Sequence, residues 1–379
     1  MKRYFYCTLL LLLLNVSGLS QYQIDIVINT NPLKAGEQIF IAGNKSEFGN
    51  WNPAAIPLKK LDDSTYYISF DFNKSEALEY KFTKGSWNNE ALNNDGKVPE
   101  NHKLIVKCDT VINIKIYKWA DEREIIFGQI TGNVKYHRNF EGKDLLPRDI
   151  IVLLPSSYDS LKSKYYPVLY MHDGQNIIDP ATSSFGIDWQ IDETADSLIR
   201  LDEIKEIIVV GIYNTSNRSL EYSNGDTGKV YMDFIVNNLK PFIDKNYRTK
   251  QDKENTAVAG SSLGGLISFM LVWEYSNVFS KAACLSPAFK YKKYPDLDYV
   301  TPVEKYSGEK KQIKLYIDNG GLGVDSLLQP GVSNMIKALY NKGFVNGEDL
   351  IYKIYPEAEH NEKAWSERVA KFLRYFFSE

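Results

Sequence analysis

Residues 256–265 read TAVAGSSLGG and contain a GxSxG pattern centred on Ser262. The apolar residues before the pattern predict a strand at Thr256–Ala259, and the run after it predicts a helix at Leu263–Tyr275. Small flanking residues permit a strained strand-to-helix turn that lifts the serine oxygen above a sheet, and the helix N-terminus stabilises negative charge nearby. We therefore interpret Ser262 as a catalytic nucleophile; the alternative is a glycine-rich turn with a purely structural role.

A nucleophilic serine in such a turn needs a general base, which follows it in the chain. His360 is the only histidine after Ser262. It stands in the sequence PEAEHNE, between a strand predicted at Leu350–Tyr355 and a helix predicted at Lys363–Phe377. Because a loop there can present an imidazole at the rim of the sheet, we interpret His360 as the base. The alternative is a surface histidine in an acidic loop.

The acid that orients the base is expected after the preceding strand, in the sequence LYIDNGGLGVDS. Both Asp318 and Asp325 qualify. We prefer Asp325, because it lies beyond the glycine-rich bend, where the chain can turn back toward the histidine, whereas Asp318 ends the strand. The aspartate that does not take this role is expected to be a turn or capping residue.

Acyl transfer also needs backbone N–H donors that face the developing oxyanion. One donor is expected at Leu263, the residue after the nucleophile. The second is expected in the sequence HDGQN at residues 172–176, where a glycine permits close approach of the backbone. We assign this donor to Gln175 or Gly174; alternatively the segment is only a turn.

From residue 121 onward, buried strands alternate with helical stretches. We predict strands at 149–154, 166–171, 206–212, 256–259, 281–285, 313–317 and 350–355, and helices at 188–200, 230–247, 263–275, 332–342 and 363–377. This alternation is typical of a mostly parallel sheet with helices on both faces. Together with the GxSxG turn between a strand and a helix, this pattern predicts an α/β-hydrolase fold for residues 121–379.

Residues 21–120 show a different pattern, in which short alternating apolar runs are separated by turn-rich segments. The strands are predicted at 24–28, 38–42, 66–70, 104–106 and 111–116. We therefore predict a small, all-β sandwich domain in front of the hydrolase domain.

Residues 1–20 are interpreted as a signal peptide, because two basic residues precede an apolar run at Tyr4–Leu14. The run is shorter than the roughly 18 apolar residues of a bilayer-spanning helix. We therefore expect an exported protein, periplasmic or extracellular, without a membrane span. An uncleaved anchor is the alternative. Beyond the signal only Cys108 and Cys284 remain, so no disulfide framework is expected.

The composition excludes several classes of partner. The 379 residues carry a formal net charge of -3, which gives no reason to expect nucleic acid as a partner. The four histidines form no short paired motif, so no metal site is predicted. No glycine-rich phosphate loop followed by lysine is present, and no cofactor is expected.

Four segments together resemble the esterase D-like family of α/β-hydrolases, which includes feruloyl and acetyl esterases, siderophore esterases and mycolyltransferases. They are RDIIVLLP with SSY at 148–158, YMHDGQN at 170–176, GSSLGG at 260–265, and His360. The resemblance covers most of residues 128–379. It implies a triad of Ser262, Asp325 and His360, although the spacing around the acid departs from the shorter loop of feruloyl esterases.

The N-terminal domain resembles a starch-binding type of carbohydrate-binding module. The resemblance rests on Gly43-Asn44, on FGNW at 48–51 and on YKFTK at 80–84, followed by Trp87. It implies that Trp51 and Trp87 stack against sugar rings. The sequence after Trp87 departs from the starch-binding pattern, so both tryptophans could instead be core residues of an immunoglobulin-like sandwich that binds no sugar.

The combined expectation is an exported serine esterase that removes acetyl or feruloyl-type groups from a carbohydrate. One alternative is a hydrolase of siderophore or other non-carbohydrate esters, which predicts cationic residues around the pocket, with Arg218 as a candidate. Another is a non-catalytic carbohydrate-binding protein that kept the hydrolase fold.

Overall fold

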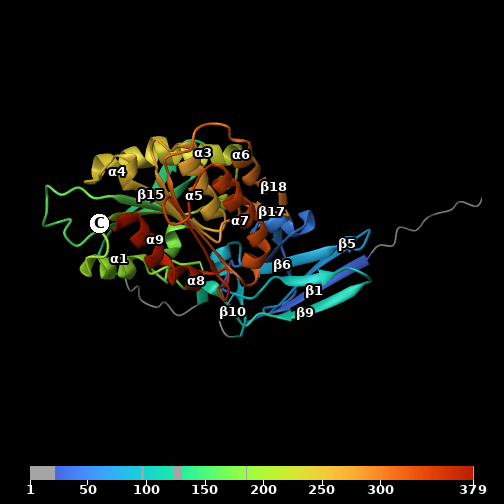
Figure 1. The fold of residues 1–379 in the computed structure, drawn as a ribbon. Helices are drawn as coiled ribbons and strands as arrows, with labels where there is room; N and C mark the ends of the chain where they lie inside the picture. Colours follow the sequence, from blue (N-terminus) through green and yellow to red (C-terminus); the bar gives the residue numbers. More distant parts are fainter. Residues whose placement is uncertain (1–21, 95–97, 123–129, 185, 293, 379) are drawn as a thin grey trace, which may run out of the picture. The chain divides into compact units, whose positions relative to one another are not determined.

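The computed structural model describes residues 22–94, 98–122, 130–184, 186–292 and 294–378 (Figure 1). The predicted signal peptide lies outside the described residues. The chain divides into two compact units, with the boundary between Arg123 and Glu124.

The N-terminal unit is a β-sandwich of two four-stranded sheets, with strand orders β4-β5-β1-β9 and β3-β2-β6-β8. β1 pairs with β5 in antiparallel and with β9 in parallel fashion, and β7 and β10 form a separate pair. Its strands are β1 (Tyr22–Asn29), β2 (Phe40–Gly43), β3 (Ile56–Pro57), β4 (Lys59–Lys60), β5 (Thr65–Phe72), β6 (Ala77–Thr83), β7 (Ala91–Leu92), β8 (His102–Ile105), β9 (Thr110–Lys115) and β10 (Lys118–Trp119). Its 3₁₀ turns are η1 (Ser46–Trp51), η2 (Trp87–Asn89) and η3 (Ala120–Glu122).

Alternation along β1 explains how the sandwich buries its core. Ile24, Ile26 and Ile28 are fully buried, whereas the residues between them face outward. They pack in one core with residues of the second sheet such as Tyr80 and Phe82 of β6. β6 is a strand that the sequence analysis did not predict.

The C-terminal unit is built on an eight-stranded sheet of order β11-β12-β14-β13-β15-β16-β19-β20. β12 pairs in antiparallel fashion with β11 and β14, and the strands from β14 to β20 are parallel. The strands of this sheet are β11 (Asn133–Gly142), β12 (Leu145–Leu154), β13 (Val168–His172), β14 (Ile208–Ile212), β15 (Thr256–Ser261), β16 (Lys281–Leu285), β19 (Lys314–Gly320) and β20 (Leu350–Tyr355). A separate hairpin joins β17 (Lys290–Tyr291) and β18 (Tyr294–Asp298).

Helices cover both faces of this sheet. α1 and α9 contribute to one core, and α3, α4, α5, α6 and α7 to the core on the other face (Figure 1). The helices are α1 (Ile191–Arg200), α2 (Arg218–Glu221), α3 (Asp226–Phe234), α4 (Lys240–Asn246), α5 (Leu263–Glu274), α6 (Val300–Lys305), α7 (Val324–Asn341), α8 (Glu362–Ser366) and α9 (Val369–Phe377), with 3₁₀ turns η4 (Gly174–Asn176) and η6 (Lys253–Asn255) and a π-helical turn η5 (Ile235–Leu239). This architecture is the α/β-hydrolase fold that the sequence predicted.

The structure corrects the predicted start of one helix. α7 begins at Val324, whereas the sequence analysis predicted a helix over 332–342. Proline and glycine are ordinarily unfavourable inside a helix, yet α7 contains both Pro330 and Gly331. The helix continues through Pro330, and Gly331 lets it pack closely on β17, since an added Cβ there would lie 2.2 Å from the carbonyl oxygen of Lys290. The predicted final helix is likewise divided into α8 and α9, and the predicted helix over 230–247 into α3, η5 and α4.

Within the described residues, we find no helix that combines the length and the apolar character of a membrane span.

Candidate active site

Ser262 lies in a tight turn between β15 and α5. Its backbone has φ 57° and ψ -122°, a region that residues with a side chain rarely occupy and that is strained for serine. The turn requires glycine at position 260, because an added Cβ there would lie 2.6 Å from the carbonyl oxygen of Gly264. Packing at Gly265 is also tight, since an added Cβ would lie 3.1 Å from the Cβ of Pro287. The half-exposed Ser262 is thus held at the amino end of a buried helix.

His360 and Asp325 form a hydrogen-bonded pair. The Nδ1 atom of His360 lies 2.5 Å from Oδ1 of Asp325, which is fully buried. The other oxygen of Asp325 accepts hydrogen bonds from the Ser286 hydroxyl and from the backbone N–H of Gly320, both at 2.8 Å. Because the carboxylate engages Nδ1 of the imidazole, Nε2 remains available to exchange a proton with another group.

The second candidate acid, Asp318, has a different set of contacts. It lies inside β19, which continues to Gly320, so it does not end the strand as the sequence suggested. Asp318 is fully buried and accepts a hydrogen bond from the Arg368 guanidinium at 2.8 Å, and it is therefore not the turn or capping residue that was expected. Of the two aspartates, therefore, Asp325 contacts His360 and Asp318 belongs to a buried ion pair. Asp325 lies in the first turn of α7 rather than in the loop where the sequence analysis expected it.

Trp365 of α8 also supports the pair of Asp325 and His360. Its ring meets the His360 ring edge-on, with the centroids 5.0 Å apart. Its Nε1 donates a hydrogen bond to the Ser286 hydroxyl at 3.1 Å, and Ser286 in turn donates to Asp325. Trp365 and Ser286 could not be recognised from the sequence, because nothing in the local pattern distinguishes them from ordinary core residues.

The predicted oxyanion segment follows β13 as the 3₁₀ turn η4, which contains Gly174 and Gln175. Gly174 is required by packing, since an added Cβ would lie 2.5 Å from the backbone of Gly211 in β14. An added Cβ at Gly264 would lie 3.2 Å from the Asp173 carboxylate, so this segment adjoins the turn that carries Ser262. The first N–H groups of a helix have no acceptor within it. In η4 the N–H of Asn176 donates to the carbonyl of Asp173, so the candidate donors for a ligand are the N–H groups of Gly174, Gln175 and Leu263.

The side chains around η4 are held by polar contacts that the sequence did not predict. Arg218 donates two hydrogen bonds to the Asp173 carboxylate, at 2.7 and 2.8 Å, and Asn214 donates a third at 2.6 Å. The backbone N–H of Asn214 also donates to the side-chain oxygen of Gln175 at 3.2 Å. The guanidinium holds the pKa of the Asp173 carboxyl below its ordinary value despite its burial. Arg218 is therefore committed to an internal ion pair.

His172, directly before this segment, has a structural environment. It is buried, and its Nδ1 lies 3.0 Å from the hydroxyl of Tyr231. Burial lowers the pKa of the imidazole to about 3. His172 is thus neutral at physiological pH.

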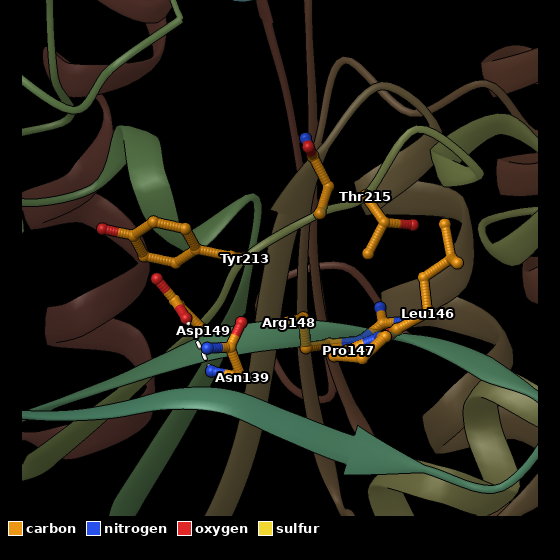
Figure 2. A pocket seen from close by; sticks show the side chains of 8 residues that line it. Asn139, Leu146, Pro147, Arg148, Asp149, Tyr213 and Thr215 are labelled. Atoms are coloured by element: carbon orange, nitrogen blue, oxygen red, sulfur yellow. Dashed lines mark hydrogen bonds between the residues drawn. The ribbon is translucent and has the colours of Figure 1, made fainter.

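A hollow of about 490 Å³ opens at the ends of β12 and β14, one strand beyond η4. Figure 2 shows Tyr213 and Leu146 on opposite sides of this hollow, with Asp149 and Arg148 on the strand between them. Its lining residues are Asn139, Leu146, Pro147, Arg148, Asp149, Tyr213, Asn214 and Thr215. Asn214 therefore contacts both the hollow and the oxyanion segment.

In the N-terminal unit, Trp51 and Trp87 are both half-buried, and their rings lie 6.4 Å apart with an angle of 42°. Neither belongs to the core of the sandwich. Phe48 anchors the turn that ends at Trp51, because it is fully buried and its ring lies 4.6 Å from that of Phe70. On the neighbouring turn, the Asn89 side chain holds the backbone just before Trp87, because it accepts hydrogen bonds from the N–H groups of Lys84 and Ser86 and donates one to the carbonyl of Lys84.

Comparisons with known proteins give a separate match for each of the two units. Residues 146–376 match the model of the family described as "Putative esterase", and residues 22–110 match that of the "Starch binding domain". The uncharacterised protein YbbA of Bacillus subtilis is 23% identical over 246 residues, which are 61% of this chain and 92% of YbbA. An endo-1,4-beta-xylanase/feruloyl esterase of Xylanibacter ruminicola is 32% identical over 142 residues, which are 36% of this chain but 19% of that protein.

Two solved structures show the same fold. A ferulic acid esterase has a TM-score of 0.54 and 21% identity, over 65% of this chain and 99% of its own. The enterochelin esterase of Shigella flexneri has a TM-score of 0.55 and 10% identity, over 94% of this chain and 92% of its own.

Fold and family matches together define a carboxylic-ester hydrolase on an α/β-hydrolase scaffold. The family model covers more than half of the chain, so the chain belongs to this esterase family, and it carries a starch-binding domain in front of the esterase domain.

Proposed function

We propose that the protein is an exported serine esterase that removes acyl groups, acetyl or feruloyl-type, from a carbohydrate. The observation that carries the proposal is the contact of 2.5 Å between His360 and the buried Asp325, in a unit whose Ser262 occupies a strained strand-to-helix turn. These residue types in this chain order are those of a Ser-His-Asp triad.

In the proposed reaction, the Ser262 hydroxyl attacks the ester carbonyl while His360 accepts the hydroxyl proton at Nε2. Asp325 holds the imidazole in the required tautomer and stabilises the imidazolium that forms. The N–H groups of Leu263 and of Gln175 or Gly174 stabilise the oxyanion. The imidazolium then protonates the leaving alcohol, and water, activated by the same histidine, hydrolyses the acyl-enzyme.

Two observations support a carbohydrate as the alcohol part of the substrate. The N-terminal unit matches a starch-binding domain, and its half-buried Trp51 and Trp87 present the flat apolar surface on which sugar rings stack. In the esterase unit, the hollow beside η4 combines polar side chains with the apolar Leu146 and Pro147 and the ring of Tyr213, so it offers both hydrogen bonds to hydroxyl groups and a flat surface to the apolar face of a sugar. Such a lining suits a hydroxyl-rich sugar better than an acyl chain.

A second candidate is the hydrolysis of a siderophore ester, because similarity to an enterochelin esterase extends over 94% of the chain. That likeness has 10% identity and reflects the fold. An anionic catecholate would need free cationic groups, whereas Arg218 is neutralised by Asp173. The acylated carbohydrate therefore remains the proposed substrate class.

The first experiment measures hydrolysis of p-nitrophenyl acetate, a feruloylated sugar and enterobactin by the parent protein and by Ser262→Ala. Loss of the nucleophile is expected to lower kcat by roughly 10⁴-fold or more, with unchanged circular dichroism. The matched control is Ser261→Ala, the neighbouring buried serine of β15. Full activity of Ser262→Ala would refute the serine mechanism, and inertness of the parent toward all three esters would favour a non-catalytic carbohydrate-binding protein.

Export is tested separately. Removal of residues 1–20 is expected to leave the protein in the cytoplasm of an expressing bacterium, whereas the full chain is recovered outside it with a new N-terminus near Gln21. Retention of the intact first 20 residues in the exported protein would indicate an anchor instead.

A further inference from the structure

Three carboxylates gather at the start of α1, outside the proposed triad. Asp188 precedes the helix, and Asp192 and Glu193 lie in its first turn. One oxygen of each carboxylate lies within 4.8 Å of the others. Asp188 and Asp192 are buried, with 6% and 1% of their surface exposed, whereas Glu193 is half-buried and gives the group access to solvent.

The carboxylates have fewer partners than their burial requires. The backbone N–H of Thr131 donates to Oδ2 of Asp192 at 2.6 Å, and that of Gln190 donates to Oδ2 of Asp188 at 2.9 Å. Oδ1 of Asp192 and Oε2 of Glu193 are buried without a hydrogen-bond partner. Among residues 22–94, 98–122, 130–184, 186–292 and 294–378, no lysine or arginine forms an ion pair with any of the three.

Such a group is unfavourable unless something neutralises it. Burying an unpaired carboxylate costs several kcal/mol in general, and like charges nearby increase that cost. The site therefore requires either a retained proton or a bound cation.

We propose that Asp188, Asp192 and Glu193 bind a calcium ion. Carboxylate oxygens are hard ligands, which favour Ca²⁺ or Mg²⁺ over softer metals. Two ligands on opposite sides of Ca²⁺ are separated by about 4.6–5.2 Å, and on opposite sides of Mg²⁺ by about 4.0–4.2 Å. The three oxygens all lie within 4.8 Å of one another, so they can ligate a single ion. Mg²⁺ is usually held by one or two carboxylates in strict octahedral geometry, whereas Ca²⁺ accepts three carboxylates, with water completing an irregular coordination shell.

The position of this calcium site connects it to the esterase centre. Trp189 directly follows Asp188, and its N–H donates to the carbonyl of Asn176 in η4 at 2.9 Å. The Trp189 ring packs on that of Trp365 with centroids 5.7 Å apart, and Trp365 contacts His360. A cation would hold the segment before α1 in place, and with it the aromatic wall behind the proposed base. Cation binding itself does not depend on the proposed function.

The experiment uses the full chain, freed of metal with EDTA and dialysed into metal-free buffer. Calorimetric titration with CaCl₂ is expected to show one site in the parent, and saturating calcium to raise the Tm of the esterase unit by roughly 3–8 °C. Asp192→Asn and Glu193→Gln should each weaken this binding at least tenfold. The matched control, Asp196→Asn, changes a carboxylate of the same helix that pairs with Arg200 and should bind like the parent.

Each result of these titrations either supports calcium binding at the three carboxylates or overturns it. Circular dichroism establishes that each variant is folded, and Glu193→Gln, at a half-buried position, provides the test if Asp192→Asn does not fold. Absence of heat and of a Tm shift in the parent overturns the proposal. Calcium binding that persists in both Asp192→Asn and Glu193→Gln also overturns the proposal, because the calcium site would then lie elsewhere in the protein. Binding of MgCl₂ as tight as that of CaCl₂ overturns the assignment to calcium.

Discussion

The two proposed functional regions of this protein are constructed differently. In the esterase unit, Asp325 is fully buried and accepts three hydrogen bonds, from His360, Ser286 and Gly320. In the starch-binding unit, Trp51 and Trp87 stand half-buried on short 3₁₀ turns and contact each other at the edge of the core. The esterase centre fixes the positions of individual polar atoms, whereas the two tryptophans present an apolar surface.

This difference follows from what each task requires. Proton transfer between a serine and a histidine depends on distances within a few tenths of an ångström, so every polar atom needs a fixed partner. Stacking of a sugar on an aromatic ring tolerates larger displacements, because the interaction depends mainly on buried apolar area. Substitutions in the esterase centre are therefore expected to have steep effects, and those in the sugar-binding surface graded ones.

The largest effect on activity is expected when the two candidate acids are each replaced by asparagine and the two variants are compared. Asp325→Asn should lower kcat/KM for p-nitrophenyl acetate by roughly 10⁴-fold, because the amide stabilises the wrong tautomer of His360. Asp318→Asn serves as the matched control, since it removes a buried carboxylate that contacts Arg368 instead. It should lower the Tm while folded protein stays active. The opposite ranking of the two activities would assign the acid role to Asp318.

The next effect concerns the ion pair beneath the oxyanion segment. Arg218→Met should lower kcat by roughly 10–100-fold, less than the 10²–10³-fold cost of deleting an oxyanion donor, because the donors are displaced rather than removed. KM for a small ester should change little. Arg218→Lys, which keeps one charged contact to Asp173, should recover part of the loss. Equal kcat values in the parent, Arg218→Met and Arg218→Lys would show that the ion pair of Arg218 and Asp173 does not position η4.

A graded effect is expected in the starch-binding unit. Trp51→Ala and Trp87→Ala should each weaken binding to soluble starch or β-cyclodextrin roughly tenfold, as removal of an aromatic anchor commonly does. Hydrolysis of p-nitrophenyl acetate should remain as in the parent. Tyr117→Ala is the control, because this tyrosine is a 44% exposed aromatic of the same unit. Binding unchanged in both tryptophan variants would contradict the proposed sugar surface.

Tyr213 tests whether the hollow beside η4 holds the sugar. Tyr213→Ala should raise KM for an acylated oligosaccharide roughly three- to tenfold, through loss of about 1 kcal/mol of ring contact. Steady-state kinetics with p-nitrophenyl acetate, which has no sugar, should give an unchanged KM. A parallel rise for both substrates would indicate a general distortion of the esterase centre.

The last effect is on stability rather than on activity or binding, and it is a pH dependence that arises from His172. Its pKa of about 3 lies below the ordinary value, so the unfolded chain binds a proton that the folded protein does not, and stability falls as pH decreases below about 6.5. Between pH 7 and pH 5 this amounts to about 2 kcal/mol. His172→Gln should flatten this part of the Tm profile. An equally steep decline in the variant would mean that other groups cause the acid sensitivity.

Much of the architecture could be predicted from the sequence. The change of apolar pattern near residue 121 indicated two domains of different class, and the alternation after it indicated the α/β-hydrolase sheet. The GxSxG pattern placed Ser262 between a strand and a helix, as the structure has it. These features are encoded in short segments, because local backbone preferences and hydrophobic periodicity act over a few residues.

Other features depend on contacts between distant parts of the chain. The sequence left Asp318 and Asp325 both open, and only the fold shows that His360 contacts Asp325, which lies 35 residues before it in the chain. Arg218 could be interpreted as a cation for substrate until the fold placed it on Asp173. Asp188 and Asp192, four residues apart, form no recognisable metal motif in the sequence. Only the structure shows that they cluster with Glu193 and that buried oxygens of Asp192 and Glu193 have no hydrogen-bond partner. Residue types and local order thus follow from sequence, whereas partner choice and burial, which set protonation and reactivity, follow from tertiary packing.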